Sequence, residues 1–468
     1  MIKQMKYFFS PKNIAIIGAS DRFYSWGNWI GANLNKYKHK NGNIFLVNPK
    51  HEEVLGKKTY ENVLSISEDI DLAVVIVPAS QVIETLEQCA EKNTKVATVI
   101  SAGFSETEKG KNLGFELKTI SKEYGIRIQG PNCAGFYNTA IPINASPLPS
   151  EYLRNKSPVA FITQSGFVGN TLSIWGANRN LSIGKYISVG NEADLTISDY
   201  IDYFSDDTTV EALLLYIEGI KYASRFQKVV KNISTEKPII VWKTSETKAV
   251  RRAALSHTAH LIGSEKIFSG LIKQLGLIRI SRLEYGLPVC HSLLRHPPLK
   301  GRRFAIMMIG AGWGIILTDT LSTAGFEVPE LSDQLKSKLK EILPSYRVSV
   351  KNPIDFGAAD TMEFRLMKKI IEIVFNSGEI DAFIIANIGE FAPFNEEARF
   401  LEIQQAKSLK RLEKHLKKPI YLFTLLNESD SDSVSKIKRK INMYHSMDEL
   451  LEVIKASYKF YNIKQKLK

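Results

Sequence analysis

The stretch "NIAIIGAS", residues 13 to 20, is a run of aliphatic residues that ends in glycine, alanine and serine. An apolar run that enters a glycine turn is typical of a strand that leads into a helix in a parallel sheet. The same pattern recurs downstream, with helix-length segments between the runs, at residues 43–49, 71–79, 96–104 and 126–132. The sequence therefore predicts an α/β domain whose turns lie at the carboxyl ends of strands, where open sheets bind ligands.

The strand and helix alternation restarts twice along the chain. A Pro-rich stretch at residues 142–153 and a second break, "RHPPLKGRR" at residues 295–303, separate three such sets. In the second set the strands are expected at residues 159–163, 186–189, 212–217 and 238–243, and in the third within 303–315, 381–389, 419–426 and 441–445. A chain of 468 residues suits about three domains. We predict domains at residues 1–147, 148–297 and 298–468.

Composition narrows the class of protein. The 44% hydrophobic and 24% charged content is that of a soluble globular protein, and no apolar run reaches membrane-spanning length, so we expect a cytoplasmic chain without membrane contact. Cys89, Cys133 and Cys290 are far apart and form no CxxC pair, which predicts neither disulfides nor a metal site. The formal charge of +13 comes from scattered lysines without a nucleic-acid-binding motif, although an anionic small ligand would profit from it.

The first glycine turn is a candidate phosphate site, because backbone N–H groups there can face an anion. Its rival is an NAD site, but the spacing from Gly18 is not GxGxxG. After the second strand the sequence has Lys50, where NAD would require an acidic residue for the ribose hydroxyls. A lysine favours a ligand with a further phosphate on its ribose.

The second candidate is "ITQSGFVGN", residues 162–170, in which a buried strand runs into Thr163, Gln164, Ser165 and Gly166. Hydroxyl and N–H groups in this turn would suit a phosphoryl group. The alternative is that Ser165 only caps the following helix, and both interpretations stay open. A GxSxG nucleophile elbow is excluded, because Thr163 stands where its first glycine should be.

These motifs, together with others in the same order, resemble the α subunit of NDP-forming acyl-CoA synthetases, typified by ADP-forming acetyl-CoA synthetase and related to succinyl-CoA synthetase. The segments that carry the resemblance are "IAIIGAS", "IFLVNPKHEEVLGKKTY", "DLAVVIVPA", "VISAGF", "YGIRIQGPNCAGFYN", "TQSGFVGN", "SVGNEADL", "LYIEGI", "AALSHTAHLIGSE", "AGWGI" and "SVKNPIDFG". The resemblance implies a Rossmann-like CoA-binding domain followed by two flavodoxin-like domains. It implies CoA contacts at Gly18, Ala19, Ser20, Asn48, Pro49, Lys50, Val77, Pro78, Ser101, Ala102, Gly103, Asn132 and Cys133.

The resemblance also assigns a role to His257, which is the phosphorylated histidine of the family's "SHT" motif. Glu218 would accept a hydrogen bond from one ring nitrogen, and the turn of Thr163, Ser165 and Gly166 would hold the phosphoryl group. The chemistry is sound, since a neutral imidazole with a pKa near ~6.5 is a nucleophile at cytoplasmic pH. An acceptor on one nitrogen leaves the lone pair of the other free to attack phosphorus.

The chain lacks a Walker A motif and has no room for an ATP-grasp region. We therefore expect ADP or ATP and Mg²⁺ mainly on a separate ATP-grasp β subunit, in a heterotetramer. CoA or acyl-CoA and a small carboxylic acid would be the other substrates. Acetate, branched-chain acids and aryl acids are all compatible with these motifs, as are ADP or GDP and either direction of reaction.

Two segments depart from the family pattern. Before and after the histidine, Ser245, Val250 and Ala259 replace glycines, which removes backbone freedom from the loop. After the first glycine turn, "DRFYSWGN" at residues 21–28 replaces a Pro-Gly pair. The alternative function is therefore a non-catalytic CoA-binding or acyl-CoA-binding regulatory protein that keeps the fold without the histidine cycle.

Overall fold

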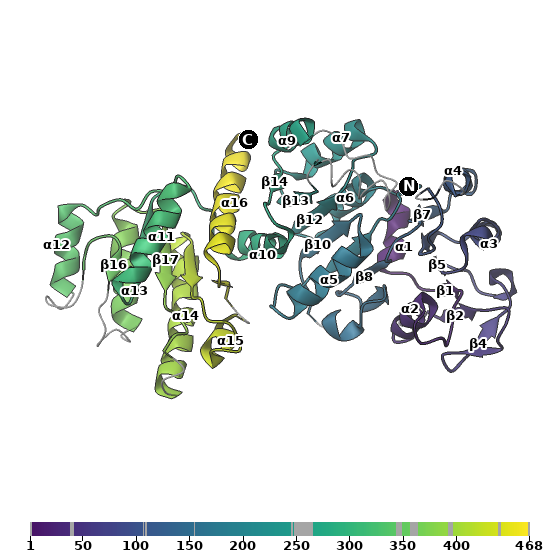
Figure 1. Ribbon diagram of the computed structural model, residues 1–468, viewed down its shortest axis with the longest axis horizontal. Helices are drawn as coiled ribbons and strands as arrows, with labels where there is room; N and C mark the ends of the chain where they lie inside the picture. The colour runs from purple at the N-terminus through teal and green to yellow at the C-terminus, as the bar shows by residue number, and fades with distance from the viewer. Residues whose placement is uncertain are drawn as a thin grey trace. The chain divides into compact units, whose positions relative to one another are not determined.

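The protein is described by a computed structural model that covers residues 2–37, 42–105, 107, 110–153, 155–244, 247, 265–342, 349–355, 364–391, 396–438 and 441–466. The chain divides into two compact units, Met1–Arg279 and Ile280–Lys468. Described residues form three sheets, two in the first unit and one in the second (Figure 1). The predicted α/β class is confirmed, because each sheet is mostly parallel and helices connect its strands.

The first sheet has seven described strands in the order β3-β4-β2-β1-β5-β6-β7. Their bounds are β1 Ile14–Ile17, β2 Ile44–Val47, β3 Glu53–Val54, β4 Lys57–Tyr60, β5 Leu72–Val75, β6 Val96–Val99 and β7 Arg127–Gln129. The connecting helices include α2 Trp26–Leu34, α3 Ala79–Glu91 and α4 Lys111–Tyr124. Apart from the short edge strand β3, this is the doubly wound order of dinucleotide-binding folds, and it reverses between β1 and β5.

The second sheet has the described strand order β14-β13-β12-β10-β11-β8-β9. The strands are β8 Phe136–Asn138, β9 Ile143–Ala145, β10 Val159–Thr163, β11 Lys185–Ser188, β12 Ala212–Ile217, β13 Ile239–Lys243 and β14 Ile278–Arg279, with helices α5 Gly166–Ala177, α6 Ile197–Asp206, α7 Ala223–Ile233 and α9 Glu265–Gln274. Its five parallel strands have the flavodoxin-like order, and the antiparallel pair β8 and β9 extends the edge. The Pro-rich stretch expected to be a break thus contains a strand, β9.

The third sheet has the described order β16-β15-β17-β18-β19, again the flavodoxin-like order. Its strands are β15 Phe304–Met308, β16 Ile354–Asp355, β17 Ala382–Ala386, β18 Ile420–Phe423 and β19 Met443–Tyr444. The helices of the second unit are α10 Gly286–Arg295, α11 Ala311–Thr323, α12 Asp333–Ile342, α13 Phe364–Asn376, α14 Glu396–Leu416, α15 Asp432–Lys438 and α16 Met447–Lys466.

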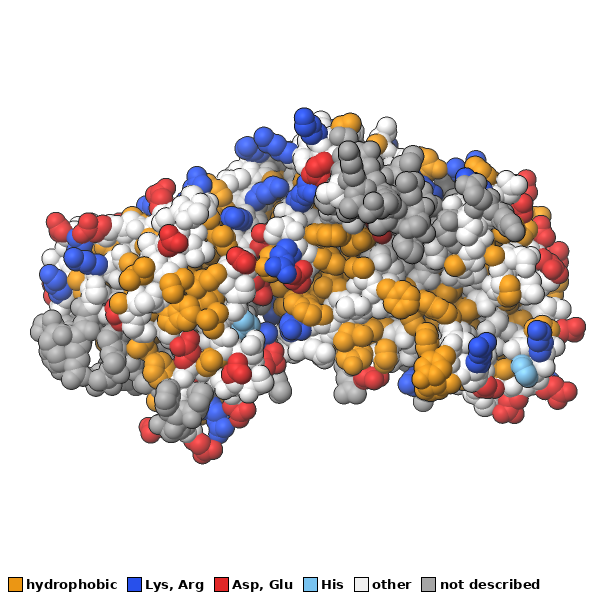
Figure 2. All heavy atoms as spheres, in the orientation of Figure 1, with side chains coloured by type: hydrophobic (Ala, Val, Ile, Leu, Met, Phe, Trp, Pro, Cys, Tyr) orange, Lys and Arg blue, Asp and Glu red, His pale blue; other side chains and the backbone are white. Residues whose placement is uncertain are grey.

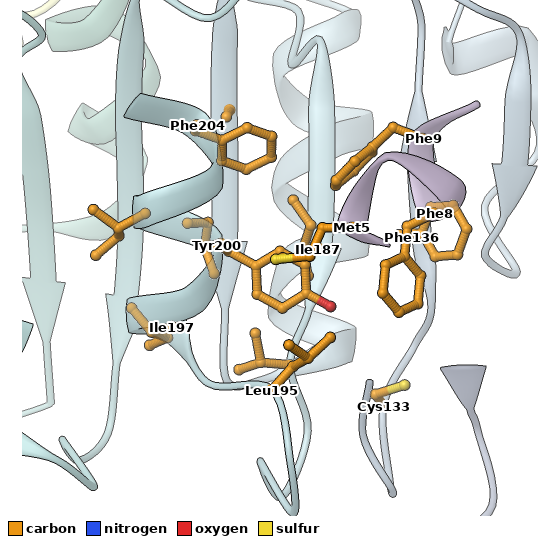
Figure 3. Close-up of a cluster of buried hydrophobic side chains, with 14 of the residues drawn as sticks. Met5, Phe8, Phe9, Cys133, Phe136, Ile187, Leu195, Ile197, Tyr200 and Phe204 are labelled. Carbon is orange, nitrogen blue, oxygen red and sulfur yellow. The ribbon is translucent and has the colours of Figure 1, made fainter. Parts of the chain in front are cut away.

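The two sheets of the first unit share one hydrophobic cluster, which runs from residues before β1 to the helices of the second sheet. Figure 3 shows how a short N-terminal segment, ending in α1 (Lys6–Phe9), contributes to it. Phe8 meets Phe136 of β8 edge-on, with ring centroids 5.7 Å apart, and Phe9 lies 5.4 Å from Phe204 of α6. Residues far apart in the sequence of the unit therefore pack in one core.

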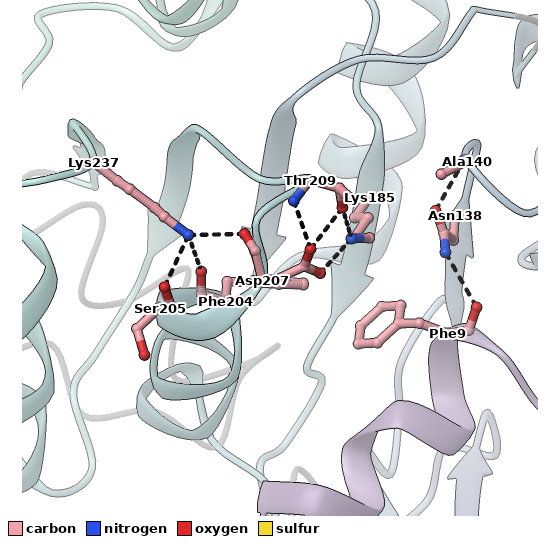
Figure 4. A network of polar contacts seen from close by, with 9 residues as sticks. All are labelled: Phe9, Asn138, Ala140, Lys185, Phe204, Ser205, Asp207, Thr209 and Lys237. Carbon is pink, nitrogen blue, oxygen red and sulfur yellow. Dashed lines mark hydrogen bonds and ion pairs between the residues drawn. The ribbon is translucent and has the colours of Figure 1, made fainter.

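Polar side chains form hydrogen bonds at the carboxyl end of α6 (Figure 4). Lys237 Nζ donates to the carbonyl oxygens of Phe204, Ser205 and Asp207 at 2.7, 2.9 and 2.8 Å. The Asp207 carboxylate is paired with the amine of Lys185. Since the last carbonyls of a helix have no partner within it, these bonds stabilise the carboxyl end of α6.

The second unit begins with residues that precede its sheet. His296, which follows α10, is buried between Glu413 of α14 and the hydroxyl of Tyr444 at 3.1 Å. The predicted domain limits at residues 147 and 297 stay predictions. The structure shows that α10, before the second limit, packs with the second unit, against α16.

Candidate functional site

The turn after β1 lies at the point where the strand order of the first sheet reverses, which is the usual ligand position in such sheets. Gly18 has a φ of +94°, and a Cβ there would lie 2.5 Å from the carbonyl oxygen of Ile76, after β5. Only glycine fits this close approach of two backbones. The helix α2 does not start directly after the turn, since residues 19–25 intervene.

Asn48 joins the turns after β1 and β2. Its side-chain Nδ2 donates to the carbonyl of Ala19 at 2.8 Å, and its Oδ1 accepts from the backbone N–H of Lys50 at 2.8 Å. Pro49 and Lys50 themselves are exposed. The structure thus brings together the predicted residues of these two turns, with the backbone of Lys50 held by Asn48.

A second group lies at the ends of β5 and β6. Ser101 Oγ donates to the carbonyl of Val77 at 2.5 Å, and the carbonyl of Ser101 accepts from the backbone N–H of Asn132 at 2.8 Å. Asn132 has a left-handed φ of 56°, and the buried Cys133 follows it. Burial raises the pKa of the Cys133 thiol to about 12, so this cysteine is a neutral lining group rather than a thiolate nucleophile.

A cleft of about 520 Å³, a size typical of small-molecule sites, connects these turns with the second sheet. Among the predicted residues, its lining includes Val77, Pro78, Ser101, Ala102, Asn132, Cys133 and Gly166. The other predicted CoA residues, Gly18, Ala19, Ser20, Asn48, Pro49, Lys50 and Gly103, lie outside this lining. One cleft therefore adjoins both the predicted CoA site and the predicted phosphate turn.

In that turn, Thr163 Oγ1 accepts from the backbone N–H of Ser165 at 3.0 Å and donates to its carbonyl at 2.9 Å. Ser165 occupies the N-cap position of α5, but its side chain makes no capping hydrogen bond. A Cβ on Gly166 would lie 2.5 Å from the Cβ of Ala134, which also lines the cleft. The start of α5 is therefore in close contact with Ala134. The side chain of Ser165 therefore does not cap α5.

Glu218 directly follows β12, the neighbour of β10, at the point where the order of the second sheet reverses. Gln164 holds its turn: Oε1 accepts from the backbone N–H groups of Glu218 and Gly219 at 2.5 and 3.0 Å. Nε2 of the same side chain donates to the carbonyl of Gly219 at 2.8 Å and to the carboxylate of Glu192 at 3.0 Å. Gln164, named from sequence only as part of the turn, is the residue that positions Glu218.

Tyr216, in β12, is affected by the same carboxylate. Burial, then the charge of Glu218 and a hydrogen bond to it, raises the pKa of Tyr216. The ring stacks on Trp242 of β13 with centroids 5.0 Å apart, which fixes the hydroxyl. The surroundings of Glu218 are therefore partly apolar, because they include the ring of Tyr216. A hydrogen bond to a charged group is stronger there than in water.

His257 lies outside the described residues, as do Ser245, Val250 and Ala259. The segment that contains them joins β13 to α9. Lys243, the last residue of β13, is in register with Ile217, the residue before Glu218. The chain thus enters the histidine segment beside the turn that carries Glu218.

The described residues contain no group of three or more His, Cys, Asp or Glu placed to hold a metal ion. Their helices include none that is both long and apolar enough to span a membrane.

Known proteins are similar to this chain both in sequence and in fold. Residues 12–139 match the CoA binding domain and residues 156–293 the succinyl-CoA ligase like flavodoxin domain. The chain is 37% identical over 371 residues to the α subunit of acetate–CoA ligase [ADP-forming] II of Pyrococcus furiosus, covering 79% of this chain and 80% of that one. It is also 37% identical over 360 residues to acetate–CoA ligase [ADP-forming] of Methanocaldococcus jannaschii, covering 77% of this chain but 50% of that protein.

Among solved structures, the dinucleotide forming acetyl-coenzyme A synthetase 1 of Ca. Korarchaeum cryptofilum, in complex with phosphate and ADP, superimposes with a TM-score of 0.85. It is 28% identical, and the match covers 99% of this chain and 98% of that one. The identity and coverage of these relatives, together with the matched domains, show that the chain belongs to the α-subunit family of the ADP-forming acetyl-CoA synthetases.

Proposed function

We propose that this chain acts with an ATP-grasp partner subunit to convert acyl-CoA, phosphate and ADP reversibly into a carboxylate, CoA and ATP, through a phosphohistidine at His257. The observation that carries this proposal is the cleft, which is lined both by Val77 and Ser101 of the predicted CoA site and by Gly166 of the predicted phosphate turn. A thioester bound there would meet phosphate at the start of α5.

The first step would take place at that junction. A phosphate oxygen attacks the thioester carbonyl carbon, the C–S bond breaks, and CoA leaves as the thiolate. Backbone N–H groups at the start of α5, with the positive end of the helix dipole, would hold the phosphate. None of the described residues that line the cleft is charged, so the incoming anion would meet no carboxylate there.

In the second step a ring nitrogen of His257 attacks the phosphorus of the acyl phosphate, and the carboxylate leaves. Glu218 would accept a hydrogen bond from the other nitrogen, which selects the tautomer and stabilises the charged product. Gln164 fixes the Glu218 turn to the phosphate turn through bonds of 2.5 to 3.0 Å. The two groups that the histidine needs are thus held together before it arrives.

The phosphoryl group would then pass from His257 to ADP on the partner subunit, where Mg²⁺ is also expected. Relatives of this chain are named as α subunits, and the M. jannaschii relative is about twice as long as the part matched here. The naming of these relatives as α subunits favours a separate nucleotide-binding chain. A member of the family has been solved with phosphate and ADP, which supports these two substrates.

Labelled ATP tests the proposal. Incubation of the chain with γ-labelled ATP, Mg²⁺ and the ATP-grasp subunit that copurifies with it should produce an acid-labile label on His257. His257→Ala should abolish the label, and His260→Ala, the neighbouring histidine, should retain it. Glu218→Gln should slow labelling by roughly 10- to 100-fold, because a hydrogen bond to a charged group is lost. Label that persists in His257→Ala would refute the phosphohistidine.

The same assay distinguishes the alternative. The residues at 245, 250 and 259, which replace family glycines, favour a CoA-binding protein without turnover. That function predicts measurable CoA binding by the wild-type chain with no label under any combination of partner and nucleotide.

A further inference from the structure

A second pocket of the first unit shares no described lining residue with the cleft predicted to bind CoA. Its volume is about 260 Å³, and we call it the lysine pocket. Its lining includes Lys111, Phe115 and Lys118 of α4, and also Lys221 and Tyr222, which lie between β12 and α7. In the space-filling view, basic and hydrophobic side chains both appear over the region of α4 (Figure 2).

The lysine pocket and the cleft are neighbours with different charge. Asn132, which lines the cleft, donates through Nδ2 to Oδ1 of Asn191, which lines the lysine pocket, at 3.3 Å. The described lining of the cleft contains no charged side chain, whereas the described lining of the lysine pocket contains three lysines and no carboxylate. The lysine pocket is therefore the one of the two whose own side chains attract an anion.

Two of the three amines are held by neutral groups. Lys118 Nζ donates to the hydroxyl oxygen of Tyr222 at 3.0 Å. Lys221 Nζ donates to the backbone carbonyls of Asn191 and Glu192 at 2.7 and 2.9 Å. Bonds to neutral acceptors fix the amines without cancelling their charge. Because both cations are in position before a ligand binds, binding costs less conformational entropy.

The amines of Lys118 and Lys221 also repel each other. Lys221 is exposed as a whole, but its amine lies among protein groups, and this burial lowers the pKa of the amine. The charge of Glu192 opposes the shift, and the charge of Lys118 adds to it. The carboxylate of Glu192 itself accepts from Gln164 and from the backbone N–H of Ile197. An anion between the two amines would offset both the desolvation and the repulsion.

Two aromatic rings lie beside these charges. Phe115 is 73% exposed and Tyr222 is 48% exposed. The amine of Lys118 is 5.6 Å from the centroid of the Tyr222 ring. Exposed aromatic rings gain free energy when a planar heteroaromatic group stacks on them. The pocket is slightly smaller than the ~300–1,000 Å³ of most ligand sites, so it suits a ligand with one ring system.

The charge of the pocket favours a dianion. A phosphate monoester carries a charge of about −1.5 to −2 at pH 7. Lys111 is the first residue of α4, and Tyr222 directly precedes α7, so the positive ends of two helix dipoles add to the lysine charges.

We propose that the lysine pocket binds a phosphate monoester that carries a heteroaromatic ring, of the class of nucleoside monophosphates. The amines of Lys118 and Lys221 contact the phosphate, and the rings of Phe115 and Tyr222 contact the base. This site is separate from the cleft and does not depend on the reaction proposed above.

Adenosine monophosphate (AMP) is the probe. It is titrated calorimetrically into the full chain with and without saturating CoA, and adenosine and inorganic phosphate are titrated separately. The variants are Lys118→Met and Phe115→Ala. Their matched controls are Lys122→Met and Tyr124→Ala, because both of these residues are exposed on α4 but lie outside the lining. Circular dichroism melts establish that each variant is folded.

We expect AMP to bind the wild type with a Kd below about 1 mM, and CoA to change this value by less than about twofold. Adenosine and phosphate should each bind at least about tenfold more weakly than AMP, since each makes only half of the contacts. Lys118→Met should weaken AMP binding by roughly tenfold or more, through loss of a bond between charged groups. Phe115→Ala should weaken it about fivefold, and the two controls should stay within about twofold.

Other results overturn the proposal. If AMP does not bind at millimolar concentration, or binds equally well to Lys118→Met, the pocket is not a phosphate site. Competition between AMP and CoA would place AMP in the cleft instead. Inorganic phosphate that binds as tightly as AMP would exclude the ring contact. If Lys118→Met and Phe115→Ala lose only association with the ATP-grasp subunit, the pocket belongs to a subunit interface. None of these outcomes alters the test of His257, so the proposed function is decided separately.

Discussion

Gln164 uses both ends of its amide within the protein. The oxygen accepts from two backbone N–H groups, and the nitrogen donates to the carbonyl of Gly219 and to Glu192. The side chain is buried, so each of these groups would lose a partner without access to bulk water if the amide were removed. A single side chain thus connects the predicted phosphate turn to the turn of Glu218.

We expect Gln164→Leu to lower the free energy of unfolding by roughly 2–4 kcal/mol, because buried polar groups are left unsatisfied. It should also slow labelling of His257, since the Glu218 turn is no longer fixed. Affinity for CoA should change little, because Gln164 does not line the cleft. Thermal unfolding, calorimetry and the labelling assay measure the three effects.

Gln81→Leu is the control for the same chemical change at an exposed position. Its stability should stay within about 0.5 kcal/mol of the wild type. If Gln164→Leu behaved in the same way, the positioning role of Gln164 would be wrong.

Only part of the candidate site can be recognised from the sequence. The turn of Thr163, Ser165 and Gly166 is visible in the sequence because it stands at the end of an apolar strand, whereas the role of Glu218 comes only from the resemblance to the family. The bonds of Gln164 connect it to residues 28 and 55 positions away, so no local spacing signals them. The edge-to-face contact between Trp26 and Phe167, which both line the cleft, is equally non-local. The role of His257 stays a prediction.

At the scale of elements, the carboxyl end of α6 depends on a lysine from another segment. Lys237, just before β13, supplies the donors for three carbonyl groups at the end of the helix. Lys237→Met should lower the free energy of unfolding of the first unit by about 1–3 kcal/mol, since those carbonyls lose a charged donor. Thermal unfolding followed by circular dichroism measures the change.

Lys228→Met is the matched control, because Lys228 lies exposed on α7. Its effect should stay within about 0.5 kcal/mol. Equal melting temperatures for the two variants would show that the lysine cap contributes nothing to stability.

His445, which directly follows β19, makes the stability of the second unit depend on pH. Burial, followed by the charge of Lys438, lowers the pKa of His445 to about 4. An unfolded histidine has a pKa near ~6.5, so between these values the unfolded chain binds more protons than the folded one. The contribution of His445 to stability is therefore complete above about pH 6.5 and is lost as the pH falls toward 4.

We expect His445→Gln to flatten the pH dependence of unfolding in this window by up to about 3 kcal/mol. Calorimetric unfolding of the full chain at a series of pH values gives the comparison. His415→Gln, at an exposed site on α14, should leave the wild-type slope unchanged. An unaltered slope in His445→Gln would contradict the assignment.

The elements themselves were predictable where they form a buried parallel sheet. β10 and β12 have the bounds expected from their apolar runs, because strands covered on both faces are continuously apolar. The pair β8 and β9 was not expected, since Pro-rich sequence around β9 gives no such signal. β14 and β16 have two residues each, too few for any periodicity.

At the scale of the whole molecule, each compact unit has its own hydrophobic core. The clusters beneath the first two sheets contain residues between 5 and 277, and the cluster of the third sheet contains residues between 305 and 443. Every described residue that lines the cleft predicted to bind CoA belongs to the first unit. The first unit thus contains a complete core and a complete cleft.

We therefore expect residues 1–279, expressed as a separate chain, to fold and to bind CoA within about threefold of the affinity of the full chain. Residues 280–468 should not bind it. Calorimetric titration of both fragments checks this. If the first fragment folds but does not bind CoA, residues of the second unit are needed for the site.

The packing of Phe8 and Phe9 onto Phe136 and Phe204 has a consequence for synthesis on the ribosome. The first sheet is translated well before α6, so Phe9 lacks its partner Phe204 until residue 204 has emerged. At roughly 5–20 residues per second, this takes about 10–40 s after Phe9 is added. During that interval the nascent chain exposes an apolar N-terminal segment that chaperones can bind, and we expect the first unit to be completed as one piece rather than sheet by sheet.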